Sequence, residues 1–262
     1  MNGRSTAEDV TNLFVHRSAA RRYGEARPYF HPLVMRRVTA VTGAARFGRA
    51  LDVACGTGQS ARALADVADA VLAVDVSAQM VGEAGPCARV RYAVGRAERL
   101  PLANGAVEVV TVGLAFHWFD QPAFLREAAR VLGPGGWLVI YNSGFLGKMA
   151  EDAAFAAWAN GAYLARYPSP ARREFGVSAE LATAGGFELR ASEPFAHDEV
   201  MSVGQLARYL ATQTNVINAV ESGRETLADV VRWIEAGAGP FFDGGTRAMR
   251  FAGRIWFLRR AE

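Results

Sequence analysis

The sequence predicts an α/β protein built on a doubly wound parallel sheet, because short apolar segments alternate with amphipathic helical segments between residues 50 and 142. Residues 70–76 are apolar almost throughout, which is typical of parallel strands covered on both faces. A glycine-rich turn at residues 55–58 lies between the first of these apolar segments and the first helical one. We therefore expect a sheet with helices on both sides.

Each element of this sheet has its own local pattern. Pro28 and Pro32 divide residues 5–43, whose apolar residues have helical spacing, into two expected helices. The expected strands of the core are residues 50–54, 70–76, 90–94, 107–114 and 137–142. The expected helices between them are residues 59–68 and 121–132. Glycines and a proline at residues 133–136 are expected to end the second of these helices.

After residue 143 the alternation becomes looser. Further helices are expected at residues 151–167, 206–213 and 227–236, and extended segments at residues 187–200 and 250–259. The chain shows no internal repeat and no low-complexity linker. We expect one domain over residues 1–262, with a ligand-binding core at residues 50–142 and a helical insert, followed by C-terminal elements, at residues 144–245.

Composition narrows the class of protein. Hydrophobic residues make up 51% and charged residues 21% of the 262 positions, as in ordinary globular proteins. The longest apolar runs are too short to cross a bilayer and the N-terminus does not have the pattern of a secretory signal, so we expect a cytoplasmic protein without a membrane partner. Its arginines are dispersed, which argues against a nucleic-acid partner. Two cysteines and four scattered histidines argue against a metal site.

The glycine-rich turn predicts a ligand. Glycines at positions 56 and 58 let a ligand approach the backbone and the N-terminus of the following helix. Asp75 ends the next expected strand, where a carboxylate can accept hydrogen bonds from ribose hydroxyls. The turn also satisfies the dinucleotide pattern G-x-G-x-x-G/A, so a nicotinamide-dependent enzyme stays open at this point, as does a tight turn without any ligand.

The surrounding motifs are more specific. The run LDVACGTG at residues 51–58 resembles motif I of the class I S-adenosylmethionine-dependent methyltransferases, particularly of the small-molecule group. Four further segments resemble the later motifs of that family: VDVS followed by Met80, GRAERLP, FHWF and RVLGPGG, at residues 74–77, 95–101, 116–119 and 130–136. These five motifs stand in order over residues 50–142. The resemblance implies a Rossmann-like sheet of seven strands whose last strand, at residues 250–259, is antiparallel.

The resemblance also implies S-adenosylmethionine as cofactor and a set of residues that hold it. These residues are Tyr23, Arg27, Asp52, Ala54, Gly56, Gly58, Gln59, Asp75, Val76, Met80, Arg96, Ala97, Glu98 and Ala115. By this resemblance Asp75 would bind the ribose and Met80 would pack on the adenine. Arg27 would pair with the methionine carboxylate, since a guanidinium fits a carboxylate, although a solvated loop arginine is the alternative.

Two residues depart from the family pattern. Ala54 replaces a frequent glycine of motif I, and Arg96 stands where an aspartate often contacts the adenine amine. We expect the turn to tolerate Ala54. The substitution at residue 96 puts the adenine contact in doubt and leaves the backbone of Ala97 to provide one.

Methyl transfer from a sulfonium requires in-line alignment more than an elaborate set of catalytic groups. His117 is the candidate general base, with a structural hydrogen-bonding role as the alternative. His117, Trp118 and Trp158 are the expected contacts to a small-molecule acceptor, with Trp158 on a helix that would cover the pocket or simply pack in the core. We expect a monomer or a homodimer.

Two other functions compete with the methyltransferase hypothesis. The hypothesis of an NAD(P)-dependent oxidoreductase is weakened because such enzymes need a Tyr-x-x-x-Lys pair. Lys148 is the only lysine, and Gly144 stands four residues before it where the tyrosine would be. A non-catalytic nucleotide-binding protein of the same fold would keep Gly56, Gly58 and Asp75 and differ only in lacking turnover.

Overall fold

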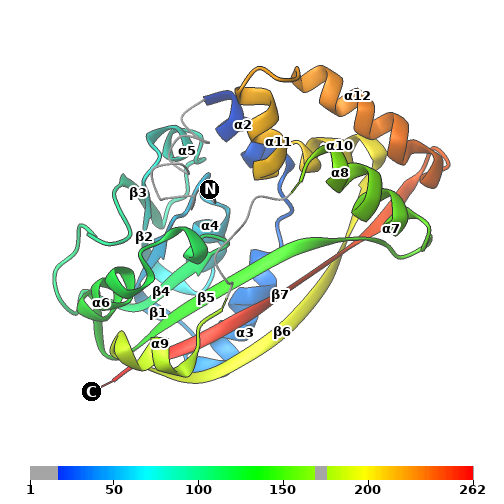
Figure 1. Ribbon diagram of the computed structural model, residues 1–262. Coiled ribbons are helices and arrows are strands. Elements are labelled where there is room, and N and C mark those ends of the chain that lie inside the picture. The colour runs from blue at the N-terminus through cyan, green and yellow to red at the C-terminus, as the bar shows by residue number, and fades with distance from the viewer. Residues whose placement is uncertain (1–16, 169–175, 262) are drawn as a thin grey trace.

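The computed structural model describes residues 17–168 and 176–261, and its centre is a seven-stranded sheet in the order β3-β2-β1-β4-β5-β7-β6 (Figure 1). The strands β1 to β5 run parallel to one another, and β7 is antiparallel to both of its neighbours. The bounds are β1 Phe47–Val53, β2 Ala68–Asp75, β3 Val90–Val94, β4 Val107–Gly113, β5 Leu132–Met149, β6 Phe187–Ser202 and β7 Thr246–Arg260. The expected Rossmann-like fold with an antiparallel last strand is therefore confirmed.

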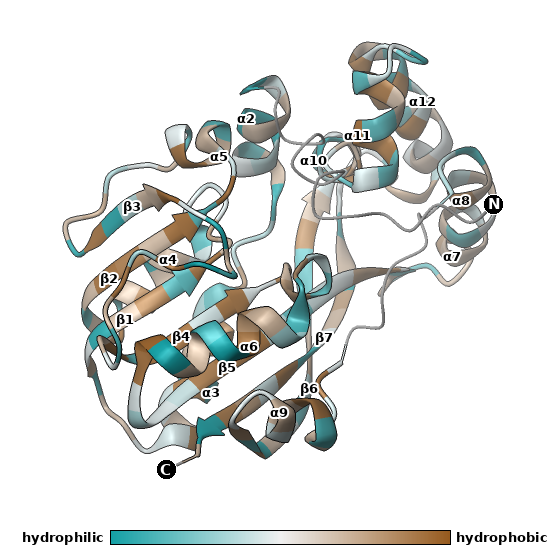
Figure 2. Ribbon diagram, turned by 60° about the vertical axis from the view of Figure 1, so that its left-hand side comes forward, coloured by the Kyte–Doolittle hydropathy of each residue, from teal (hydrophilic) through white to brown (hydrophobic). Residues whose placement is uncertain are grey.

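Helices cover both faces of the sheet because each presents an apolar stripe to it. On one face α6 (Gln121–Val131) buries Phe124 and Leu125, and α9 (Ala179–Ala184) packs beside it. On the other face α3 (His31–Thr42) and α4 (Gln59–Ala65) pack against the sheet with Val34 and Leu64 among their buried residues. In Figure 2 the strands are largely hydrophobic, whereas α6 carries hydrophilic residues on its outer side. Two further helices, α2 (Arg17–Ala26) and α5 (Ala78–Gly82), lie near the ends of β2 and β3.

A second group of helices packs around the extended ends of β5, β6 and β7 (Figure 1). It consists of α7 (Phe155–Ala157), a π-helical turn (Trp158–Tyr163), α8 (Leu164–Arg166), α10 (Val203–Leu210), α11 (Thr214–Glu221) and α12 (Leu227–Ala238). Its core contains Met149, Met249 and Phe251 from the strands and Leu206 and Ile234 from the helices. No helix of residues 17–168 and 176–261 is long and apolar enough to cross a membrane.

Several boundaries differ from the sequence expectation. The strand expected at residues 137–142 continues to Met149, because β7 pairs with it as far as Met149 even where its sequence becomes polar and glycine-rich. The helix expected over residues 151–167 begins only at Phe155 and widens into the π-helical turn. Helices α5 and α9, of five and six residues, are too short for a periodic pattern, and α11 was not expected from the sequence. Residues 5–16 of the expected N-terminal helices lie outside the described residues.

Candidate functional site

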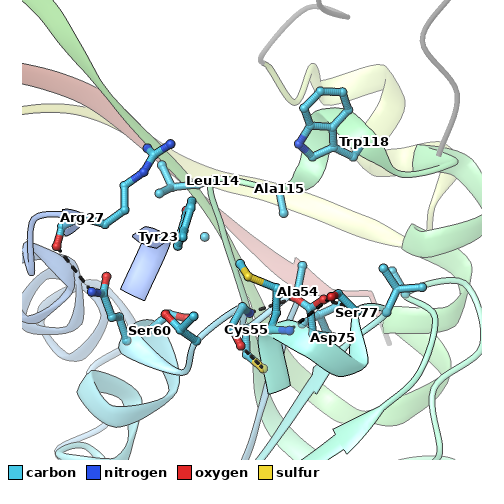
Figure 3. A pocket seen from close by; sticks show the side chains of 18 of the residues that line it. Tyr23, Arg27, Ala54, Cys55, Ser60, Asp75, Ser77, Leu114, Ala115 and Trp118 are labelled. Carbon is cyan, nitrogen blue, oxygen red and sulfur yellow. Dashed lines mark hydrogen bonds between the residues drawn. The ribbon is translucent and has the colours of Figure 1, made fainter. Parts of the chain in front are cut away.

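A cavity of about 240 Å³ opens at the edge of the sheet where the parallel strands end, as ligand sites of open α/β folds do. The segments after β1, β2, β3, β4 and β5 form its floor and sides, and α2, α10 and α11 contribute to it from the helical parts of the chain. In Figure 3 Tyr23 and Arg27 face the cavity from one side and Trp118 from the other. Segments far apart in the sequence therefore line one continuous site.

The turn after β1 shapes the floor of this cavity. Ala54, Gly56 and Gly58 all have positive φ angles, of 57°, 53° and 81°. Gly58 N–H donates to the carbonyl oxygen of Cys55 at 2.9 Å, which closes the turn at the start of α4. A Cβ on Gly58 would lie 2.4 Å from the Tyr92 hydroxyl, so this position has no room for a side chain unless Tyr92 moves. The turn accepts Ala54 in a left-handed conformation that favours glycine.

Asp75 connects the turn to the end of β2. Its carboxylate accepts hydrogen bonds at 2.8 Å from the backbone N–H groups of Gly56 and Ser77. Burial raises the pKa of Asp75, and those backbone bonds oppose the rise. The side chain lines the cavity, so its remaining lone pairs are available to hydroxyl groups of a ligand.

Asp52 lies beneath the floor and does not line the cavity. Its carboxylate accepts hydrogen bonds from the hydroxyls of Ser60 in α4 and Thr111 in β4, the latter at 2.8 Å. Burial raises its pKa to about 7, although both hydrogen bonds oppose the rise. Asp52 thus joins three elements and orients Ser60, which does line the cavity.

The N-terminal segment closes one side of the site. The Arg27 guanidinium lies 4.5 Å from the Tyr23 ring centroid and 5.4 Å from that of Tyr209, and it donates to the carbonyl oxygen of Thr212 at 2.8 Å. The Gln59 side chain donates to the carbonyl oxygens of Gly24 and Arg27 at 3.3 and 3.4 Å. This segment is therefore bound both to the glycine turn and to the end of α10.

The opposite wall follows β4. Leu114 has a φ of 63°, and a short 3-10 turn, Phe116–Trp118, places the buried His117 and the ring of Trp118 at the cavity. The His117 and Trp118 ring centroids are 4.4 Å apart. In the loop after β3 Arg96 Nε lies 3.7 Å from Glu98 Oε2, and both residues line the cavity.

The structure brings most of the expected residues together. Those that line the cavity are Tyr23, Arg27, Ala54, Gly56, Gln59, Asp75, Val76, Met80, Arg96, Ala97, Glu98, Ala115, His117 and Trp118. Asp52, Gly58 and Trp158 lie outside its lining. Trp158 packs instead among the insert helices, because its ring joins the aromatic core there, 6.2 Å from Trp233 and 5.5 Å from Phe155 between ring centroids.

Other lining residues escaped the sequence reasoning, among them His31, Ser143, Tyr209 and Gln213. Ser143 follows the fifth expected strand and could have been found from strand order alone, since parallel strands end at one edge. His31 is buried, its Nδ1 lies 2.9 Å from the Tyr141 hydroxyl, and burial lowers its pKa to about 3. His31 is therefore neutral near pH 7.

The residues present fit S-adenosylmethionine. The hydroxyl oxygen of Thr57 and the Nε of Arg27 are buried without a hydrogen-bond partner among the described residues, at the turn and at the proposed carboxylate end of the site. Gly56 has no side chain to fill the floor of the cavity; a Cβ there would lie 3.1 Å from the Met80 methyl group and crowd it. Across residues 17–168 and 176–261 no cluster of three or more histidine, cysteine or acidic side chains could hold a metal ion.

Known proteins share the segment that builds this floor. Residues 51–140 match the family described as "Methyltransferase domain". The chain is 37% identical over 130 residues to the malonyl-[acyl-carrier protein] O-methyltransferase of Enterobacter lignolyticus, covering 46% of this chain and 51% of that protein. It is 38% identical over 109 residues to a ubiquinone/menaquinone biosynthesis C-methyltransferase of Rubrivivax gelatinosus, covering 40% and 43%.

A solved structure extends the likeness over nearly the whole fold. A protein of Anaeromyxobacter dehalogenans, assigned as a type II methyltransferase, has a TM-score of 0.65 and 27% identity, and the match covers 88% of this chain and 95% of that one. By sequence, the chain spans about two fifths to one half of the length of the curated relatives it matches. The family match ends within β5, before the helical insert.

Proposed function

Residues 51–140 match the methyltransferase-domain family, and from this premise we propose that the chain is a class I methyltransferase that transfers a methyl group from S-adenosylmethionine to a small-molecule acceptor. The observation that carries the proposal is the glycine turn after β1 together with the carboxylate that binds it. Gly56 and Gly58 have left-handed conformations, and Asp75 accepts the N–H of Gly56 while lining the same cavity. In this proposal residues 50–142 hold the cofactor and residues 144–245 shape the acceptor side.

When bound, S-adenosylmethionine supplies an electrophilic methyl group on a sulfonium. Asp75 would accept the ribose hydroxyls, and Met80 would pack on the adenine. At the other end Arg27 would pair with the methionine carboxylate. Tyr23 and Tyr209 hold its guanidinium in place, and their ring faces also favour a nearby positive charge. These residues supply positioning and exclusion of water, which account for much of the rate of an in-line displacement.

The acceptor would enter from the side of α10 and α11, where His117 and Trp118 form one wall and Tyr209 and Gln213 the other. His117 is the histidine for which we proposed base catalysis, and its burial beside Trp118 also suits a wall residue. The matched relatives include an O-methyltransferase and a C-methyltransferase, so the nucleophilic atom has to be found with a panel of acceptors.

Calorimetry tests the cofactor directly. S-adenosylhomocysteine should bind and NAD should not; tight binding of NAD with no response to S-adenosylhomocysteine would support the oxidoreductase instead. Replacing Asp75 with alanine should weaken S-adenosylhomocysteine binding by about 1–3 kcal/mol, because buried ligand hydroxyls lose their partner. Asp69→Ala, on the same strand but exposed, is the matched control and should bind normally. Release of S-adenosylhomocysteine with an acceptor panel then separates an enzyme from a binding protein.

A further inference from the structure

Three side chains of β5 and β6 are connected by hydrogen bonds, and the first of them lines the cavity. Ser143 of β5 lines the cavity, and its hydroxyl oxygen lies 3.1 Å from Nε2 of His197 in β6. The other ring nitrogen of His197, Nδ1, lies 3.0 Å from Oε1 of Glu199. The His197 side chain is only 6% exposed, whereas that of Glu199 is 29% exposed. The two hydrogen bonds therefore connect the cavity, through the buried ring of His197, to the partly solvent-exposed carboxylate of Glu199.

The direction of these hydrogen bonds follows from the chemistry of the groups. An ionised carboxylate can only accept, so Nδ1 of His197 must be the donor to Glu199. In the neutral ring Nε2 then has a free lone pair, and the Ser143 hydroxyl must donate to it. A hydroxyl bonded to a histidine that a carboxylate orients is the arrangement in which a base activates a serine.

The surrounding packing fixes the His197 ring. Phe30 and Phe251 stack on it at centroid distances of 5.1 and 5.2 Å, each inclined by 17°, and Phe195 is nearly parallel at 6.1 Å. These ring contacts hold the imidazole in one orientation between Ser143 and Glu199.

The strand between Ser143 and His197 is shaped to allow their contact. Gly253 of β7 pairs with Ser143 on one side and with Phe195 on the other. A Cβ on Gly253 would lie 1.9 Å from the carbonyl oxygen of Asn142, so β5 and β7 approach too closely there for any side chain. With no side chain at residue 253, nothing on β7 at this position stands between the serine of β5 and the histidine of β6.

We propose that Ser143, His197 and Glu199 form a proton relay that deprotonates the methyl acceptor, which would therefore be a hydroxyl compound or a protonated amine. This inference rests on the proposed function. A protonated amine must first lose its proton to free the nitrogen lone pair, whereas a hydroxyl can lose its proton as its oxygen bonds to the methyl carbon; in both cases the carbon–sulfur bond then breaks and its electron pair stays on sulfur. The acceptor proton passes to Ser143 Oγ while the serine proton passes to Nε2 of His197, and Glu199 stabilises the cationic ring. Ser143 touches the acceptor; His197 and Glu199 are positioning residues.

His31, which also lines the cavity, is a poor acceptor for that proton. Burial lowers the pKa of His31 to about 3, and its Nδ1 is already engaged with Tyr141. Such a weak base stays neutral when a proton is released nearby. His197 is hydrogen-bonded to both Ser143 and Glu199, so the path for the proton runs through its ring and not through His31.

Diisopropyl fluorophosphate tests the relay without knowledge of the acceptor. The Ser143 oxygen should attack phosphorus, fluoride should leave, and the proton should pass to His197; mass spectrometry should find the label on Ser143. His197→Gln should slow labelling by about a hundredfold. Glu199→Gln should slow it at least about tenfold. Asp198→Asn, beside Glu199 but paired with Arg250, is the matched control and should label normally.

Chemical rescue separates a proton acceptor from a packing residue. In His197→Gly, added imidazole should restore labelling, whereas pyrrole, which fills similar space without a basic nitrogen, should not. Equal rescue by pyrrole, or labelling unaffected by His197→Gln, overturns the relay. Labelling should persist when S-adenosylhomocysteine is bound; if bound S-adenosylhomocysteine blocks it, Ser143 lies on the cofactor side and the assignment to the acceptor is wrong.

The same variants are measured by calorimetry with S-adenosylhomocysteine. Retained binding shows that His197→Gln and His197→Gly are folded, so a loss of labelling in them is then a loss of the relay. If wild-type protein labels at Ser143 but binds no S-adenosylhomocysteine, the proposed cofactor is wrong, and the assignment of the relay to a methyl acceptor is overturned with it. The two failures therefore give different results.

Discussion

Asp52→Asn should remove a pH-dependent loss of stability. The carboxyl group is fully buried between the hydroxyls of Ser60 and Thr111. Its pKa rises from an ordinary 3.8 to about 7 because burial disfavours the charged form. A raised pKa means that the stabilising contribution is fully present below pH 3.8 and is lost as the pH rises through 7. The total loss is about 4 kcal/mol, at 1.36 kcal/mol per pH unit.

About 3 kcal/mol of this loss should fall between pH 5 and pH 9, because the pKa of the folded state lies inside that range. Asparagine keeps the size of the side chain and can still bond both hydroxyls, since each hydroxyl can donate or accept. The free energy of unfolding of the variant should therefore lack this decline. At pH 9 Asp52→Asn should be more stable than the wild type.

Urea unfolding of both proteins at pH 5, 7 and 9 measures the effect. Taking the difference between the two proteins at each pH removes the contribution of all other titrating groups. A difference that stays constant within about 0.5 kcal/mol across this range would refute the assigned pKa and show that Asp52 stays ionised in the folded protein. S-adenosylhomocysteine binding, measured at pH 7, reports whether Ser60 keeps its place.

Two further predictions concern the long strands. Gly253→Ala should destabilise the protein by about 3 kcal/mol or more, because its Cβ would overlap the carbonyl oxygen of Asn142, whereas Gly144→Ala, with open space at its Cβ, should change stability by less than about 1 kcal/mol. Thermal unfolding of the two variants tests this contrast, and equal effects would contradict it. Tyr141→Phe should cost about 1–3 kcal/mol, because Nδ1 of the buried His31 loses its partner. The prediction fails if urea unfolding shows no loss.

The sequence predicted which residues lie together around the glycine turn because this part of the cavity depends on local patterns. Apolar strands predict where the chain ends each crossing of the sheet, and parallel strands end at one edge. The glycine turn, Asp75 and the loop around Arg96 therefore had to lie together. Asp52 was a different case. Its place in the motif is clear, yet only the structure shows that its partners are the hydroxyls of Ser60 and Thr111 rather than the cavity.

The part of the cavity where we propose that the acceptor binds depends on pairings between distant segments. Ser143 and His197 are 54 residues apart and meet across a third strand, so no periodicity in the sequence relates them. Tyr209 and Gln213 reach the cavity through the fold of the insert. Trp158 illustrates the converse: an aromatic residue at helical spacing fits a pocket cover and a core equally well, and the structure places it among Phe155 and Trp233.

The unusual length of β5, β6 and β7 has a mechanical consequence. Each of these strands has one end in the central sheet and the other in the core of the insert helices, where Met149, Met201 and Met249 lie; β5 and β6 run toward the insert and β7 runs back from it. Backbone hydrogen bonds between paired strands resist bending much more than a loop does, and here the pairing runs along most of these strands, with register shifts at residues 145–149 of β5 and 189–191 of β6. The two halves of the cavity are thus held in place by the same three strands. Replacement of whole insert helices at the far end of these strands would therefore change acceptor choice during evolution without disturbing the geometry at the glycine turn.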